Sequence, residues 1–175
     1  MLSLVYLMDR LRTLFLIPTL LTLCGVIVPA ACQEKQRRPS RYLIPKGYVG
    51  WVQIDFKVRD ARLLPTEDGH YLFKFPPSGR LRTSSDIEYG SASGDDFYYY
   101  SGGERQRLEA TMSGEGGMIW EQSNGSVQDG ANNVTAIFED LFVGTEEQFE
   151  RCGDVRGDIK IGPLNEEAIK KCMEK

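Results

Sequence analysis

Short segments of alternating apolar and polar residues dominate this chain from residue 42 to residue 143. In the segment 48–58, Val52, Ile54 and Phe56 alternate with mostly polar residues, and this period of two is typical of a half-buried strand. Turn-forming residues separate the segments, and we expect Gly69 to take a positive φ in one such turn. We predict strands at 48–58, 70–75, 81–84, 97–100, 105–112, 118–121 and 134–143, with a polar loop at 122–133. This pattern predicts a mainly β fold, either a single β-sandwich or a small barrel.

Helical signals appear only near the end of the chain. Thr145 followed by Gln148 forms a capping box, in which each side chain bonds the backbone of the other residue. Asn165 is a suitable N-cap for a second helix, on which Ile169 and Cys172 share one face. We therefore expect one or two short C-terminal helices after the last strand.

The N-terminal segment 8–32 has the layout of an export signal. A short charged start precedes an apolar run that ends at Val28, and Ala30 and Ala31 come directly before Cys32. This order resembles a bacterial lipoprotein signal, in which the cysteine is lipidated and becomes the mature N-terminus. Pro29 departs from that pattern, because a branched apolar residue is usual at its position.

Two alternatives to lipidation remain open. The signal is cleaved near Ala31 without lipid attachment, or the apolar run of about 19 residues stays in the membrane as an anchor. We expect residues 1–31 to be a signal peptide, with Met8 as the candidate true start because residues 1–7 carry no charge. The expected modification is lipidation of Cys32.

Residues 32–41 are polar and basic, and we expect them to form a flexible tether before a β-rich domain at 42–175. Without residues 1–31 the chain has 19 basic and 24 acidic residues, a net charge of −5. No basic run follows residue 41, which argues against nucleic-acid binding. The expected partner is the membrane, through the lipid anchor. The expected location is extracytoplasmic, at the periplasm or cell surface, with a secreted protein as the alternative.

Four cysteines are present, and the signal accounts for two of them. Cys24 lies within the signal and Cys32 is the lipidation site. Cys152 and Cys172 remain, and in an oxidising compartment we expect them to form a disulfide. A metal site is the rival interpretation, but His70 is the only histidine and lies far away in sequence. We therefore predict no metal and no cofactor.

Two sequence motifs resemble a known family. The motifs YLIPKGYVGWV (42–52) and EDGHYLFKFPPSGRLRTSS (67–85), together with FVGT at 142–145, are similar to a bacterial family of secreted or lipid-anchored proteins with a domain of unknown function. The resemblance implies an extracytoplasmic bacterial protein and assigns no site residues. The strand and turn order of DGHYLFKFPPSG also resembles, at the level of fold, the transthyretin-like sandwiches of secreted peptidases and outer-membrane receptors.

The aromatic residues are the first candidate binding surface. Trp51, Tyr98, Tyr100 and Trp120 lie in predicted strands and, if exposed on one face, would stack on sugar rings or anchor a protein partner. The alternative is that a second layer or the terminal helices bury them. An envelope glycan or an envelope protein is therefore the expected ligand.

The arginines are the second candidate. Arg80 with Arg82, and Arg105 with Arg107, are two apart in predicted strands, so each pair shares a face and would form a basic stripe for an anionic partner. The alternative is that each arginine pairs with a nearby acid. These surfaces favour a binding or structural module of the cell envelope, and the runner-up is a hydrolase or accessory subunit that acts on envelope polymers.

Catalytic patterns are weak, so we predict that the chain is not an enzyme. His70 follows an Asp-Gly turn and has no serine in a nucleophile pattern beside it. The adjacent carboxylates Asp95-Asp96 and Glu139-Asp140 would serve acid–base chemistry only if burial separated their pKa values. The segment 154–158, DVRGD, offers two carboxylates to calcium and an adhesion tripeptide, and both are weak signals.

Overall fold

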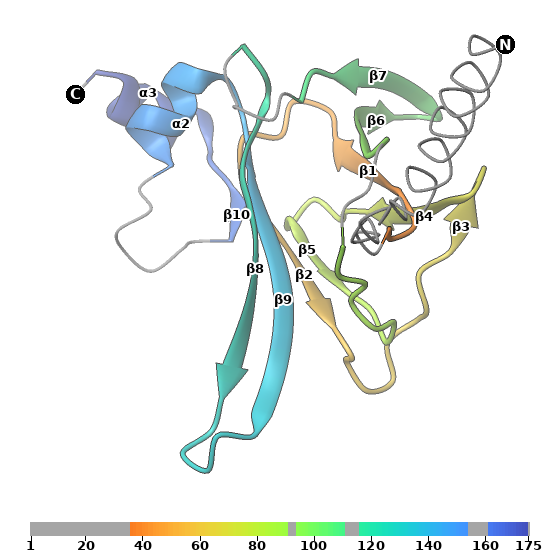
Figure 1. Ribbon diagram of the computed structural model, residues 1–175. Coiled ribbons are helices and arrows are strands. Elements are labelled where there is room, and N and C mark those ends of the chain that lie inside the picture. Colours follow the sequence, from red (N-terminus) through yellow and green to blue (C-terminus); the bar gives the residue numbers. More distant parts are fainter. Residues whose placement is uncertain (1–35, 91–93, 111–115, 154–160, 175) are drawn as a thin grey trace, which may run out of the picture. The chain divides into compact units, whose positions relative to one another are not determined.

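The computed structural model describes residues 36–90, 94–110, 116–153 and 161–174. The chain divides into two units, 1–33 and 34–175, and the architecture below is that of the second unit. Its described residues form two mixed sheets of five strands each and two short helices near the C-terminus (Figure 1). The signal and Cys32 lie outside the described residues.

The first sheet has the strand order β3-β4-β1-β6-β7. Its strands are β1 (Ser40–Pro45), β3 (Thr66–Glu67), β4 (His70–Lys74), β6 (Asp96–Ser101) and β7 (Glu104–Leu108). The central strand β1 is parallel to both β4 and β6, whereas β3 and β7 pair antiparallel at the edges. The turn between β3 and β4 contains Gly69 at φ 82°, as the sequence predicts.

The second sheet has the order β10-β2-β9-β8, and β5 pairs with β2 beside this path. Its strands are β2 (Gly50–Phe56), β5 (Arg80–Arg82), β8 (Ile119–Gln128), β9 (Val134–Val143) and β10 (Gly162–Pro163). Strand β5 is parallel to β2, and β9 runs antiparallel to both β2 and β8. Neither sheet closes on itself, so the small barrel is not formed.

The main hydrophobic core lies between the two sheets. Tyr42 stacks on Phe73 and Phe97 from the neighbouring strands, with ring centroids 5.0 and 4.5 Å away. Apolar side chains of the second sheet meet these rings, namely Val52, Ile54, Phe56, Ile119, Leu141 and Val143. The period of two in the sequence therefore marks the face that each strand turns to this core.

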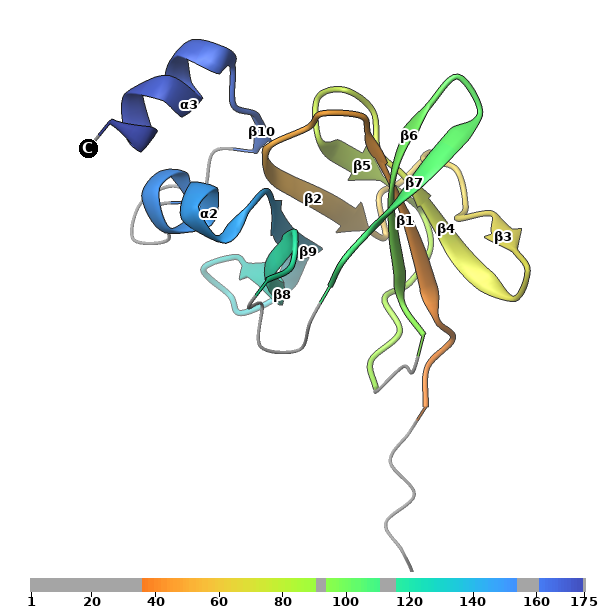
Figure 2. The ribbon, with the colours of Figure 1, turned by 90° about the horizontal axis from the view of Figure 1, so that it is seen from above.

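A second cluster occupies the opposite face of the second sheet. Trp51, Trp120 and Phe142 are buried there, and Phe149 of the first helix packs against them. The ring of Phe149 stacks on Trp120 with the centroids 5.4 Å apart. Viewed from above, the second sheet lies between the helices on one side and the first sheet on the other (Figure 2).

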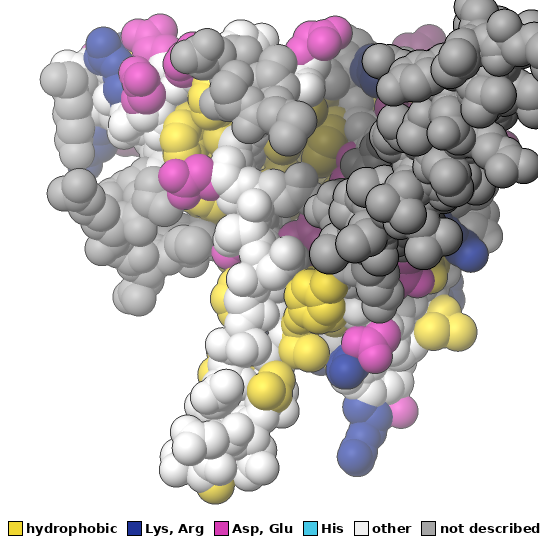
Figure 3. Space-filling view, viewed as in Figure 1, with side chains coloured by type: hydrophobic (Ala, Val, Ile, Leu, Met, Phe, Trp, Pro, Cys, Tyr) yellow, Lys and Arg dark blue, Asp and Glu magenta, His cyan; other side chains and the backbone are white. Residues whose placement is uncertain are grey.

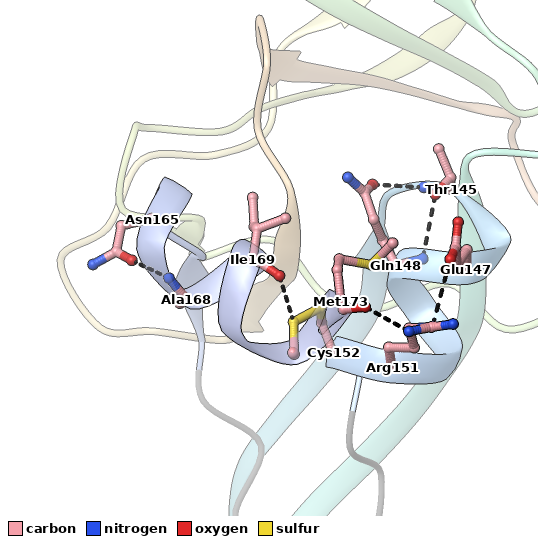
Figure 4. Close-up of a disulfide and its surroundings, with 10 residues drawn as sticks. Thr145, Glu147, Gln148, Arg151, Cys152, Asn165, Ala168, Ile169 and Met173 are labelled. Atoms are coloured by element: carbon pink, nitrogen blue, oxygen red, sulfur yellow. Dashed lines mark hydrogen bonds and ion pairs between the residues drawn. A yellow bond between two sulfur atoms is a disulfide. The ribbon is translucent and has the colours of Figure 1, made fainter. Parts of the chain in front are cut away.

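The two helices have the caps that the sequence predicts. Helix α2 (Glu146–Cys152) begins with the full capping box of Thr145 and Gln148, and helix α3 (Glu166–Met173) is capped by the side chain of Asn165. The disulfide Cys152–Cys172 joins the two helices, with the Cα atoms 5.5 Å apart (Figure 4). The predicted pairing is therefore present in the structure.

Two boundaries differ from those predicted. The first part of the predicted loop 122–133 is a strand, because β8 continues to Gln128. A turn at 129–133 then leads into β9. Backbone pairing with β9 holds these polar residues in a strand, and hydrophobic alternation does not detect an exposed strand of this kind. The second boundary is the one between the predicted tether, 32–41, and the β-rich domain. Strand β1 begins at Ser40, and Arg37 forms an ion pair with Asp95, so these residues of the predicted tether belong to the folded unit.

Both hydrophobic clusters, both sheets and the disulfide lie within residues 40–173. Removal of residues 1–31 therefore takes away no residue of either core. We use the chain that begins at residue 32 in the binding experiments proposed below.

Candidate functional site

The aromatic residues predicted to form one platform lie in two different sheets. Trp51 and Trp120 are only 6% and 8% exposed, beneath helix α2. Their indole N–H groups donate to backbone carbonyls, Trp51 to Gly153 at 3.1 Å and Trp120 to Gly144 at 2.9 Å. For these two tryptophans the alternative interpretation therefore holds, because helix α2 covers this face of the sheet.

The two tyrosines lie on β6 in the first sheet and are half-buried. They alternate with the core residue Phe97, so they belong to the face of the sheet away from the core. The hydroxyl of Tyr100 donates to the carbonyl of Phe75 at 2.8 Å, and Lys74 lies 5.1 Å from its ring centroid. Tyr98 and Tyr100 therefore cannot form one surface with the tryptophans.

The two arginine pairs also belong to different sheets, so the single basic stripe does not form. Arg105 and Arg107 lie on β7 at the edge of the first sheet, and Arg80 and Arg82 lie on β5 beside the second. Spacing within a strand predicts which residues share a face, but it does not predict which sheet the strand joins.

Arg105 and Arg107 are neutralised by local acids. Arg105 forms a two-point ion pair with Glu67, at 2.5 and 2.9 Å, and Arg107 lies 3.1 Å from Asp96. Arg41 also reaches Glu67 at 2.9 Å. The hydrogen bonds from Arg105 and Arg41 lower the pKa of Glu67 to about 2. This face is therefore a network of mutually paired charges, which matches the alternative interpretation of these arginines.

Arg80 and Arg82, in contrast, line a groove beside β2 and β9 with a volume of about 770 Å³. Its cations are Lys57, Arg59, Arg80 and Arg82, and its single carboxylate is Asp55. Phe56, Val58, Ala136 and Ile137 provide its apolar lining. Figure 3 shows basic side chains at the lower end of the molecule, to one side of the β8–β9 hairpin. We call this feature the basic groove.

Two of the four groove cations have partners among the described residues and two have none there. The Nε of Arg80 donates to Asp55 at 2.7 Å, and Lys57 lies 3.0 Å from Asp86. Arg59 and Arg82 are exposed and have no ion-pair or hydrogen-bond partner within the described part of the chain. An unpaired guanidinium on an open groove is free to bind a phosphate or carboxylate through two hydrogen bonds. Arg59 and Arg82 are therefore the candidate ligand-binding residues.

Sequence analysis identified Arg80 and Arg82 but missed Lys57 and Arg59. The missing signal is the short basic segment 57–62, KVRDAR, directly after the β2 alternation ends. Only the pairing of β5 with β2 brings this segment beside Arg80 and Arg82, because β2 and β5 are separated by more than twenty residues of sequence.

The candidate catalytic residues occupy separate places. His70 begins β4, with its Nδ1 3.0 Å from the carbonyl oxygen of Asp68 and its Nε2 3.8 Å from Asp96. Asp95 pairs with Arg37 and accepts the backbone N–H of Ser40, whereas neighbouring Asp96 belongs to the charge network of the first sheet. Each member of the Asp95-Asp96 pair is therefore held by its own cation.

The pair Glu139-Asp140 is buried. Glu139 points to the core between the sheets, where it accepts hydrogen bonds from the Tyr42 hydroxyl at 2.8 Å and from Gln122 at 3.0 Å. Asp140 accepts a hydrogen bond from Ser123. Burial raises the pKa of Glu139, while its hydrogen bonds and Arg37 lower it. The depression beside Glu139 has a volume of about 20 Å³, which is room for about one water molecule.

Glu139 should make the protein less stable as the pH rises. A carboxyl whose pKa is raised on folding holds its proton to higher pH in the folded state, so its stabilising contribution is complete below the unfolded pKa near 4.3 and is lost as the pH rises through the folded pKa. Glu139→Gln should remove this decline in the free energy of unfolding between pH 4 and pH 8. Urea titrations across this range measure it, with the exposed Glu150→Gln as control. Equal pH profiles for wild type and both variants would contradict the assignment.

Two other features named from the sequence lie outside the described residues. Cys32 and the segment 154–158 are not described. No helix in the described ranges is long and apolar enough to cross a bilayer. The same ranges contain no group of three or more His, Cys, Asp or Glu side chains placed to hold a metal ion.

Residues 36–152 match the profile of a family of unknown function, DUF6843. The chain belongs to this family. This confirms the family resemblance that the sequence motifs predict. The DUF6843 chain is also similar to the crystal structure of a presumed lipoprotein from Bacillus anthracis, with 24% identity and a TM-score of 0.55 over 80% of this chain and 92% of that one. That likeness shows a shared fold. No curated protein matches the DUF6843 chain.

Proposed function

We propose that this protein is a lipid-anchored, extracytoplasmic binding module of the cell envelope. The segment 8–32 with Ala30 and Ala31 before Cys32 supports the anchor. The disulfide Cys152–Cys172 supports an oxidising compartment, and the protein of the same fold in Bacillus anthracis is itself a presumed lipoprotein. The alternative of a secreted protein differs only in the absence of the lipid.

The observation that carries the binding role is the basic groove with its two unpaired arginines. Four cations and one carboxylate line it, although residues 32–175 carry a net charge of −5. Positive charge is thus concentrated at one place on an acidic protein, and a cleft lined by one sign of charge attracts the opposite sign. The ligand class that fits is an anionic component of the envelope.

We assign the chain no catalytic activity. The hydrolase alternative has its best candidate in buried Glu139, but the space beside this carboxyl has room for about one water molecule and not for a polymer. Tyr42 and Gln122 also occupy one of its oxygen atoms through hydrogen bonds.

The groove is tested with inorganic polyphosphate, a soluble polyanion, and the unlipidated chain 32–175 carrying Cys32→Ser. Arg59→Gln/Arg82→Gln should weaken binding at least about tenfold, since each arginine–phosphate contact contributes about 1 kcal/mol or more. Isothermal titration calorimetry measures the affinity. The control Lys46→Gln/Lys171→Gln removes the same charge from two exposed lysines that have no partner among the described residues, and it should bind within about twofold of wild type.

Equal affinities of the two double variants would overturn the groove as the binding site. The anchor is tested separately in a bacterium fed a labelled fatty acid. The wild-type chain should become labelled and sediment with membranes, and Cys32→Ala should do neither. A Cys32→Ala chain that remains labelled would refute the lipid anchor.

A further inference from the structure

The basic groove adjoins the place where the chain enters the folded unit. Arg37 is held there by Asp95 through a two-point ion pair, and Arg37 lines the same depression as Phe56 and Asp86. Phe56 also lines the basic groove, and Lys57 of the groove forms its ion pair with Asp86. The two depressions are therefore neighbours, joined by Phe56 and by the ion pair between Lys57 and Asp86.

The chain length keeps this part of the domain close to the membrane. The expected lipidation site Cys32 and Arg37 are five positions apart, with four residues between them. A fully extended chain of five residues spans at most about 18 Å, so Arg37 cannot lie farther than this from the lipidated cysteine. The groove that adjoins the depression lined by Arg37 is therefore held near the lipid headgroups.

The charge distribution favours the orientation with the groove toward the membrane. An anionic bilayer surface attracts nearby lysines and arginines and repels carboxylates. Arg59 and Arg82 of the groove have no ion-pair partner among the described residues, whereas Arg105 and Arg107 of the first sheet are paired with Glu67 and Asp96. The groove thus offers exposed guanidinium groups near the point of attachment.

We propose that the basic groove binds the phosphate of anionic phospholipid headgroups in the membrane that holds the Cys32 anchor, with Arg59 and Arg82 as its ligands. This inference rests on the proposed function and names its ligand. The groove would fix the orientation of the domain on the membrane.

The test uses the chain 32–175 with Cys32→Ser, so that no lipid contributes to binding. It should sediment with vesicles of phosphatidylcholine and phosphatidylglycerol and not with vesicles of phosphatidylcholine alone. Arg59→Gln/Arg82→Gln should reduce the partition coefficient about tenfold to thirtyfold, since each cation near an anionic surface contributes roughly fivefold. The control Lys46→Gln/Lys171→Gln should stay within about twofold of wild type, because its lysines lie away from the groove.

Each outcome separates the lipid assignment from the proposed function. Binding to both vesicle types alike, or equal loss in the two double variants, would overturn the headgroup site. If the wild type binds polyphosphate through Arg59 and Arg82 but does not bind phosphatidylglycerol vesicles, the lipid assignment fails and the basic groove stands as an anion-binding site. If it binds neither, both fail. Circular dichroism of each variant shows that these exposed substitutions leave the fold intact.

Discussion

Trp51→Ala is expected to lower the free energy of unfolding by about 3–5 kcal/mol, the range for truncation of a buried tryptophan. The side chain is 6% exposed and lies edge-on to Phe142 and Phe149, with centroids 5.7 and 6.5 Å away. Its indole N–H donates to the carbonyl of Gly153 at the end of α2. The substitution therefore leaves a cavity between the second sheet and α2 and an unpaired carbonyl. Urea unfolding followed by the fluorescence of Trp120 measures the loss.

Two further variants serve as comparisons for Trp51→Ala. Trp51→Phe keeps a ring in the cluster but removes the bond to Gly153, so its cost should be smaller, about 1–2 kcal/mol. Leu63→Ala removes a large apolar side chain that is 72% exposed, and it should change stability by less than about 0.5 kcal/mol. A loss below about 1 kcal/mol for Trp51→Ala would mean that the helices do not cover this face of the sheet in solution.

Breaking the Cys152–Cys172 disulfide should cost about 3 kcal/mol, because the bond closes a loop of 20 residues and restricts the unfolded chain. In the folded state it joins α2, which packs on the tryptophans through Phe149, to α3. Figure 4 shows the two helices side by side, with Arg151 of α2 donating to the carbonyl of Met173 in α3. The variant Cys152→Ser/Cys172→Ser should therefore unfold at lower urea concentration.

Reduction gives an independent measurement of the same quantity. Wild-type protein in reductant should match the double serine variant, whereas the variant itself should not respond to reductant. An unfolding midpoint that is unchanged when the wild type is reduced would show that the bond is absent or does not constrain the chain. Mass spectrometry after thiol alkylation establishes which of these two applies.

The local structure could be predicted where it depends on neighbouring residues. The alternation Val52, Ile54, Phe56 marks the core face of β2, and Thr145 with Gln148 marks the start of α2. These signals are visible because periods of two and caps are formed within a few residues of sequence. The exposed strand at 122–128 was missed because its regularity comes from pairing with β9.

The candidate site depended on contacts between distant segments. The spacing correctly predicts that Arg80 and Arg82 lie on one strand. It wrongly groups them with Arg105 and Arg107 in one basic surface. The structure joins them to Lys57 and Arg59 instead, because β5 pairs with β2. Trp51 shows the same limit, since a strand pattern indicates two faces and does not indicate which of them a helix covers.

The sequence by itself predicts a mainly β chain with a capped C-terminal helical end, one pair of cysteines suited to a disulfide, and an export signal that ends at Cys32. Only the tertiary structure decided that Trp51 is core, that Arg105 is paired with Glu67, and that Arg59 and Arg82 line one groove with no partner in the described part of the chain. The physical reason is that periodicity and capping are local, whereas burial and charge pairing depend on which strands and helices meet in space.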